Sequence, residues 1–219
     1  MHGERHVICP KSKTKILMTG IKKEVKTMGR EAILKSIKNN KPDLLSIPEI
    51  DVTQFTEEVN LIEVFKNNVN LVGGNIKEVD PQDIDVEIKK MYPNAEKIVS
   101  VADECSLGTV QISGKTDPHE LNSIDLAIIK GSLGVAENGA VWISENEIVV
   151  RALPFITNDL VIVLPKDQLY LHLLHAYEII GKRERRFGLF LSGPSKTADI
   201  EQCLVIGAQG AISLTVILI

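Results

Sequence analysis

Short aliphatic runs separated by segments of helical spacing are the feature that most limits how this chain can fold. Three such runs cover residues 125–129, 159–164 and 214–219. A strand that is buried on both faces, as in a parallel sheet, has this continuous apolar pattern rather than an alternating one. Residues 166–181 instead repeat apolar side chains at helical spacing, which predicts a long helix. Strands that alternate with helices predict an α/β fold whose parallel or mixed sheet is covered on both faces.

The remaining elements can be predicted from caps, breakers and spacing. Helices are expected over residues 29–40 and 81–91, and a third after an N-cap at Thr56. Asn138 and Gly139 predict a tight turn that leads into a strand. Further strands are expected at residues 76–79, 97–101, 139–144 and 187–191, with loops at residues 131–134 and 192–195.

The chain divides into three predicted parts. Residues 1–28 are expected to be a disordered basic tail or an over-long start, because they are rich in lysine and Met28 offers a later start. Residues 29–55 are expected to form a helical arm and linker, which prolines interrupt. Residues 56–219 are expected to form the main α/β domain.

Charge is unevenly distributed along the chain. The net charge is −4, but residues 1–27 hold seven Lys or Arg against two Glu, which leaves −9 on the rest. Nucleic-acid binding depends on clustered Lys and Arg side chains that neutralise phosphates. We therefore expect no nucleic acid as the main partner.

The cysteines and the apolar runs bear on cofactors and compartment. Cys9, Cys105 and Cys203 are far apart and form no C-x-x-C pair. This usage predicts a reducing, cytoplasmic compartment and no metal or iron–sulfur cluster bound by this chain. No apolar run approaches the roughly 18 residues of a membrane-spanning helix, so we expect no membrane span.

The first candidate site is the turn that follows the predicted strand at residues 187–191. It reads Gly-Pro-Ser-Lys-Thr-Ala-Asp-Ile-Glu over residues 193–201. The residue before Lys196 is not glycine, so the turn is not a P-loop. Ser195, Thr197 and local amides could hold a small anion, with Lys196 supplying charge, because open α/β sheets bind ligands at strand ends. Alternatively, Ser195 and Thr197 only cap the segment that follows.

Two further candidates are weaker. Glu137 lies among small residues just before a strand, where a carboxylate could act as nucleophile or general base. In the alternative, it is an acidic residue of a hairpin turn. His172, His175 and Glu178 would share one face of the predicted long helix, but a solvated surface explains them better than a metal site, so no metal site is predicted.

The sequence resembles the LUD-domain family, of the lactate utilization protein C type. The segment 193–201 matches the Gly-Pro-Ser-(Arg/Lys)-Thr-Ala-Asp-Ile-Glu signature of that family, and an aliphatic Gly-x-x-Gly segment follows at residues 204–210. Residues 136–139 read Ala-Glu-Asn-Gly where the family usually has Ala-Glu-Thr-Gly. The resemblance covers roughly residues 29–219.

The resemblance implies a fold, partners and site residues. The implied fold is the three-layer α/β/α sandwich, with a mainly parallel central sheet, of sugar-phosphate isomerases and CoA-transferases. Members of the protein C type act with two iron–sulfur partner subunits in the oxidation of L-lactate to pyruvate, and no cofactor is expected in this chain. Glu137 is the candidate catalytic residue. The candidate ligand-binding residues are Gly193, Ser195, Lys196, Thr197, Asp199 and Glu201.

Two departures from the family pattern open alternatives. Lys196 stands where Arg is common, which would weaken bidentate binding of a carboxylate or phosphate. Asn138 makes residues 136–139 similar to the Ser-Glu-Asn-Gly of CoA-transferases, in which the Glu attacks an acyl-CoA. Three functions follow, in order of preference. They are an accessory subunit of a lactate-oxidising complex, a CoA-transferase- or isomerase-like enzyme that uses Glu137, and a small-anion binding module.

Overall fold

The computed structural model describes residues 29–46, 48–55, 57–183, 187–198 and 204–219. The chain divides into two units, residues 1–49 and 50–219. In the first unit, helix α1 (Arg30–Asn39) confirms the helix predicted there, and all of its residues are exposed. The predicted tail at residues 1–28 lies outside the described residues. The division into an arm and a main domain at residue 56 remains a prediction.

A parallel sheet of five strands forms the centre of the second unit. Its strand order is β1-β11-β6-β3-β2, and every neighbouring pair runs parallel. The three aliphatic runs of the sequence form its inner strands, which are almost completely buried. The α/β fold with a mainly parallel central sheet is therefore confirmed. The strands are β1 (Asn75–Glu78), β2 (Ile98–Ser100), β3 (Leu126–Lys130), β6 (Asp159–Leu164) and β11 (Ser213–Leu218).

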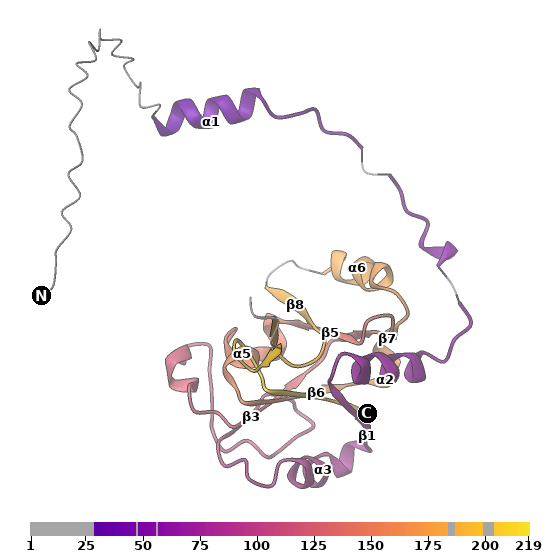
Figure 1. The fold of residues 1–219 in the computed structure, drawn as a ribbon, viewed down its shortest axis with the longest axis vertical. Helices are drawn as coiled ribbons and strands as arrows, with labels where there is room; N and C mark the ends of the chain where they lie inside the picture. The colour runs from indigo at the N-terminus through magenta and orange to yellow at the C-terminus, as the bar shows by residue number, and fades with distance from the viewer. Residues whose placement is uncertain (1–28, 47, 56, 184–186, 199–203) are drawn as a thin grey trace, which may run out of the picture. The chain divides into compact units, whose positions relative to one another are not determined.

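The two faces of the parallel sheet are covered differently. Helix α3 (Ile84–Met91) packs Ile84 and Ile88 onto one face. Helix α2 (Leu61–Leu71) packs Phe65 onto the opposite face, which it shares with a second, smaller sheet. Helix α6 (Leu173–Gly181) covers the outer side of that second sheet. Figure 1 shows α3 and α6 on opposite sides of the strands.

The second sheet is mixed, with the order β7-β4-β5-β8. Strands β4 and β5 form a hairpin whose turn contains Asn138 and Gly139, as predicted. Strand β4 occupies part of the segment predicted as a loop. The strands are β4 (Leu133–Val135), β5 (Ala140–Ser144), β7 (Leu169–Tyr170) and β8 (Gly188–Leu191).

Short elements complete the described part of the chain. A further two-stranded antiparallel ladder follows β8 and was not predicted. Its strands are β9 (Lys196–Ala198) and β10 (Leu204–Ile206), and the short helices are α4 (Glu145–Ile148), α5 (Leu153–Ile156), η1 (Val52–Gln54), η2 (Pro81–Asp83), η3 (Pro118–Leu121) and η4 (Lys166–Gln168).

Two predicted helices differ from the structure. The prediction of a single helix over residues 166–181 is wrong, because β7 lies within this segment, pairs with β4 and buries Leu169. Helix α6 therefore begins at Leu173, and His172 is its N-cap residue. The helix expected after Thr56 begins only at Leu61, where the Asn60 side chain accepts a hydrogen bond from the amide of Glu63. Thr56 itself lies outside the described residues.

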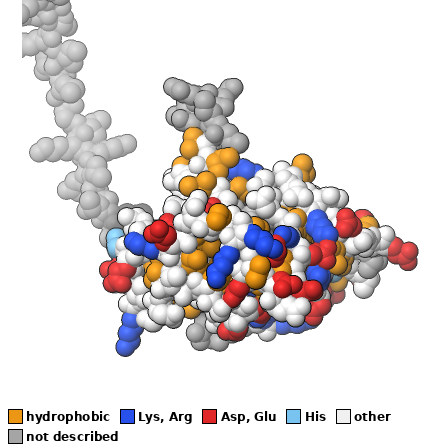
Figure 2. Space-filling view, turned by 90° about the horizontal axis from the view of Figure 1, so that it is seen from below, with side chains coloured by type: hydrophobic (Ala, Val, Ile, Leu, Met, Phe, Trp, Pro, Cys, Tyr) orange, Lys and Arg blue, Asp and Glu red, His pale blue; other side chains and the backbone are white. Residues whose placement is uncertain are grey.

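The surface around α3 carries charges of both signs. Figure 2 views the molecule from this side and shows Lys and Arg side chains interleaved with Asp and Glu. Glu87 of α3 forms ion pairs with Lys77 and Lys90. Hydrogen bonds from these two lysines lower the pKa of Glu87 to about 2. Within the described part of the chain, no helix combines the length and the apolar character needed to cross a membrane.

The turn between β4 and β5 provides a test of how closely the second sheet packs against α2. Gly139 has a positive φ of 64°, and a Cβ atom there would lie 2.7 Å from the backbone nitrogen of Val69 in α2. Because both the backbone conformation and the space exclude a side chain, Gly139→Ala is expected to lower the free energy of unfolding by about 2 kcal/mol or more. Urea denaturation measures this change.

The control for that test is Gly114→Ala, since no heavy atom lies within 4 Å of a Cβ at Gly114. Its unfolding midpoint should stay close to that of the parent chain. Equal stability of the two variants would contradict the close approach of the hairpin turn to α2.

Candidate functional site

The Ala-Glu-Asn-Gly segment at residues 136–139 (the first motif) and the described start of the segment 193–201 (the second motif) meet beside the last turn of α2. The Asn68 side chain donates a hydrogen bond to the carbonyl oxygen of Ala136, at 2.7 Å. The Ser192 hydroxyl donates to the carbonyl oxygen of Asn138, at 2.8 Å. A Cβ atom at Gly193, where φ is 75°, would lie 2.5 Å from the carbonyl oxygen of Val72. Only glycine therefore fits where the second motif crosses the end of α2.

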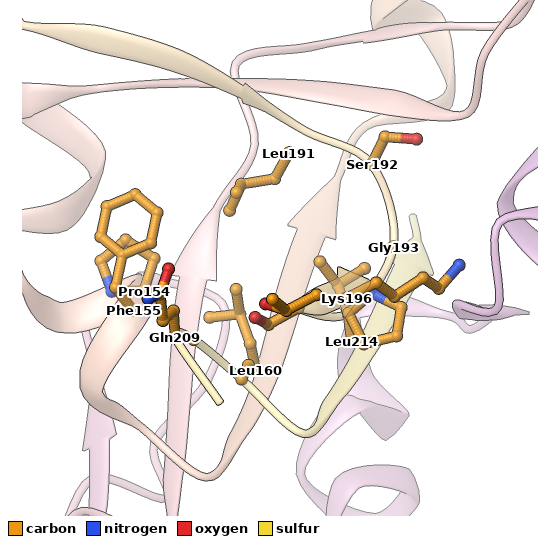
Figure 3. Close-up of a pocket in the computed structure, with 14 residues that line it drawn as sticks. Pro154, Phe155, Leu160, Leu191, Ser192, Gly193, Lys196, Gln209 and Leu214 are labelled. Atoms are coloured by element: carbon orange, nitrogen blue, oxygen red, sulfur yellow. The ribbon is translucent and has the colours of Figure 1, made fainter. Parts of the chain in front are cut away.

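A pocket of about 330 Å³ opens beside the second motif, as Figure 3 shows. Its apolar wall includes Leu160 and Leu214, which lie near the amino ends of β6 and β11. The motif was predicted to follow a strand of an open parallel sheet. Instead, the preceding strand β8 belongs to the mixed sheet and pairs antiparallel with β5. Of the predicted ligand-binding residues, the pocket brings together Gly193, Ser195, Lys196 and Thr197.

The charged end of Lys196 is already occupied. Its Nζ atom donates a hydrogen bond to the carbonyl oxygen of Val72. In Figure 3 the amine points away from Phe155 and Leu160, which lie on the other side of the pocket. The pocket is therefore lined by the stem of Lys196 rather than by its charge. Asp199 and Glu201 lie outside the described residues.

Glu137 is bonded to the start of α6 and does not line this pocket. Its Oε1 atom accepts a hydrogen bond from the amide of Leu173 at 2.7 Å, and its Oε2 atom lies 2.7 Å from Nδ1 of His172. A carboxylate in this position satisfies an unpaired amide of the first helical turn and interacts favourably with the helix dipole. Glu137 thus joins the hairpin turn to α6.

Two histidines, His172 and His175, lie at the start of α6. The rings of His172 and His175 lie 5.8 Å apart, but His172 is bonded to Glu137 through Nδ1. Its Nε2 atom is buried and has no hydrogen-bond partner among the described residues. In the part of the chain that the structure describes, no three His, Cys, Asp or Glu side chains are placed to hold a metal ion.

Sequence reasoning missed a second polar site, at the carboxyl ends of β3 and β6. Lys130 is the last residue of β3 and forms an ion pair with Glu104 at 2.7 Å. Burial is the largest single influence on Glu104 and opposes its ionisation, but the hydrogen bond and the charge of Lys130 together with a backbone hydrogen bond outweigh it and lower the pKa of Glu104. The same hydrogen bond raises the pKa of Lys130. A lysine directly after a buried aliphatic run was the available signal.

The bonds of Glu137 lead to a prediction about stability. Glu137→Ala removes the acceptor for the Leu173 amide and the partner of His172, and should lower the free energy of unfolding by about 1–2 kcal/mol. Glu137→Gln keeps an oxygen acceptor and should lower it by less. Thermal and urea unfolding would measure both variants.

Glu57→Ala, which removes an exposed carboxylate from a segment outside the helices, provides the matched control and should unfold like the parent chain. If Glu137→Ala were as stable as this control, the carboxylate would not hold the start of α6.

Comparison with known proteins agrees with the resemblance. The family model described as LUD domain matches residues 13–219. The lactate utilization protein C of Anoxybacillus flavithermus is 27% identical over 107 residues, which cover 48% of this chain and 49% of that protein. The lactate utilization protein C of an Exiguobacterium species is 22% identical over 214 residues, covering 89% of this chain and 91% of that protein. With the first three relatives, the matched region spans only about half of their length.

A solved structure supports the fold. The crystal structure of a DUF162 family protein from Deinococcus radiodurans superimposes with a TM-score of 0.58 at 18% sequence identity. The superposition covers 72% of this chain and 95% of that one, so it supports the architecture alone. The family model, however, matches nearly the whole chain. The chain therefore belongs to the LUD-domain family.

Proposed function

We propose that this chain is an accessory subunit of a lactate-utilization system and does not turn over substrate by itself. Relatives across most of its length are named lactate utilization protein C. In this proposal the chain acts beside iron–sulfur subunits that oxidise L-lactate to pyruvate. These relatives are 21% and 22% identical to this chain.

The observation that best supports this proposal is that both candidate reactive groups, the Glu137 carboxylate and the Lys196 amine, form hydrogen bonds within the chain. The Glu137 carboxylate is held by the Leu173 amide and by His172, each at 2.7 Å. A nucleophile or base needs a free oxygen within reach of the reacting atom. The Lys196 amine is bonded to Val72, and Glu137 does not line the pocket that contains Lys196. This arrangement supports a binding or structural role better than a catalytic one.

We place the iron–sulfur clusters of the system on the partner subunits. Cluster ligation requires thiolates, usually from closely spaced cysteines. Cys105 is buried in the core beneath α3, and burial raises the pKa of its thiol to about 11. A thiol of this kind is a poor cluster ligand, which supports the assignment.

Reconstitution tests the accessory role. L-lactate-dependent reduction of a dye would be measured for the chain alone, for iron–sulfur proteins encoded beside its gene, and for the mixture. Only the mixture should be active. Glu137→Gln should retain the activity of the mixture to within about twofold, because a catalytic carboxylate typically contributes 10²–10⁴-fold.

Two results would count against the accessory role. One is lactate oxidation or acyl transfer by the chain alone. The other is a loss of about a hundredfold or more in the Glu137→Gln mixture while its circular dichroism and melting temperature stay unchanged. The second result would favour the enzyme that uses Glu137.

The pocket beside Lys196 favours a second candidate function, small-anion binding. About 330 Å³ is enough for a small carboxylic acid, and Ser195 and Thr197 line it with hydroxyl groups. An anion could compete with the Val72 carbonyl for the Lys196 amine. This rearrangement would give the pocket the charge that it lacks in the structure.

Calorimetry with L-lactate and with pyruvate tests this candidate. Saturable binding is expected, and Lys196→Ala should weaken it by at least about tenfold because a charge-assisted hydrogen bond is lost. Lys115→Ala, a change to an exposed lysine in a loop, should bind like the parent chain. If the Lys196 and Lys115 variants bound the anions with equal affinity, the pocket beside Lys196 would not be the binding site.

A further inference from the structure

The carboxyl edge of the parallel sheet carries a site that the proposed function does not use. Open α/β sheets bind ligands outside the carboxyl ends of their strands. Lys130 ends β3, and Pro165 directly follows β6. A pocket of about 380 Å³ lies between them, and Ser132, Glu147 and Asp167 also line it. We call it the polar pocket.

A larger pocket of about 840 Å³ adjoins the polar pocket. Glu147 lines both. Arg183 lines the larger pocket and donates a hydrogen bond at 2.5 Å to the hydroxyl of Ser132, which lines the polar pocket. The two pockets therefore share Glu147 and meet at the hydrogen bond between Arg183 and Ser132.

The larger pocket has an aromatic wall. Trp142, Tyr177 and Phe187 line it. The Trp142 ring packs against Phe190 at 4.8 Å between centroids, and Tyr177 contacts the same ring at 5.8 Å. Tyr177 remains 54% exposed, so its ring is available for stacking. A pocket with this wall suits a planar ring, because aromatic side chains stack on the faces of such rings.

The polar pocket suits hydroxyl groups rather than an anion. The Lys130 ammonium is paired with Glu104 at 2.7 Å, so the carboxylates of Glu147 and Asp167 outnumber Arg183, the one remaining cation described there, which donates a hydrogen bond to Ser132. The Oε2 atom of Glu147 already accepts a hydrogen bond from the Ser144 amide at 2.6 Å. Its Oε1 atom and the Asp167 carboxylate can only accept hydrogen bonds while they are ionised. They attract hydroxyl donors and repel a phosphate or carboxylate.

We propose that these two pockets form a binding site for a neutral molecule with a planar heteroaromatic ring and several hydroxyl groups, of the ribonucleoside type. The ring stacks between the aromatic side chains of the larger pocket. The sugar hydroxyls donate hydrogen bonds to Glu147 and Asp167 in the polar pocket. This site is separate from the pocket beside Lys196, which lies at the amino ends of β6 and β11.

Fluorescence titration with adenosine tests the site. Trp142 is the only tryptophan of the chain, so its emission reports directly on the larger pocket. A saturable change is expected below about 1 mM adenosine, an affinity that stacking and a few hydrogen bonds can supply. Adenosine 5′-monophosphate should bind at least about tenfold more weakly, because its phosphate meets the acidic side chains. Ribose alone should give no signal.

Substitutions locate the binding. Tyr177→Ala should weaken adenosine binding by about tenfold because stacking is lost. Asp167→Asn should weaken it by about fivefold because a charge-assisted hydrogen bond is lost. Asp167 is exposed, so the melting temperature of its variant should not change. Tyr177→Ala also loses the edge contact with Phe190, so its fold is checked by circular dichroism, which should be unchanged. Asp80→Asn, an exposed aspartate before η2, is the matched control and should bind normally.

Three outcomes overturn the proposal. They are the absence of a saturable change up to about 1 mM adenosine, adenosine 5′-monophosphate binding as tightly as adenosine, and normal affinity in both the Tyr177 and Asp167 variants. None of these depends on lactate oxidation, so the site can fail while the accessory role stands.

Discussion

The close approach of the two sheets is the constraint on which the rest of the structure depends. A Cβ atom at Gly131 would lie 2.6 Å from Val141 of β5, and one at Gly134 of β4 would lie 2.8 Å from Leu164 of β6. The chain can leave the parallel sheet and enter the second one only because these positions lack side chains. This crossing places the hairpin turn beside α2 and Glu137 beside α6. It also turns Trp142 to the outer face of the second sheet.

The inner strands could be predicted from the sequence, whereas the second sheet could not. Burial on both faces leaves a continuous aliphatic run, so β3, β6 and β11 are visible without a structure. Strands β4 and β7 have only three and two residues and show no pattern of their own. They exist because they pair with each other across a long sequence separation, and that pairing outweighs the helical spacing of residues 166–181.

The candidate site was predictable in its backbone and not in its side-chain bonds. Glycines in the two motifs indicated tight turns, and Gly139 and Gly193 do have positive φ. The roles of the charged side chains depend on distant segments. Glu137 meets the amide of Leu173, 36 residues further on, and Lys196 meets Val72, 124 residues earlier. No pattern near either residue in the sequence predicts these partners.

The order of strands in the parallel sheet has a consequence for synthesis of the chain. Among the described strands, β1 is at the edge of the sheet and pairs with β11 alone, and β11 also pairs with β6. The first strand of the domain therefore has no partner until its last strand has left the ribosome. Contacts of this sequence separation form slowly, and unpaired strand edges invite association in the meantime. The partner that secures β1 is thus the strand that synthesis supplies last, whereas the opposite edge strand, β2, finds its partner β3 soon after it is made.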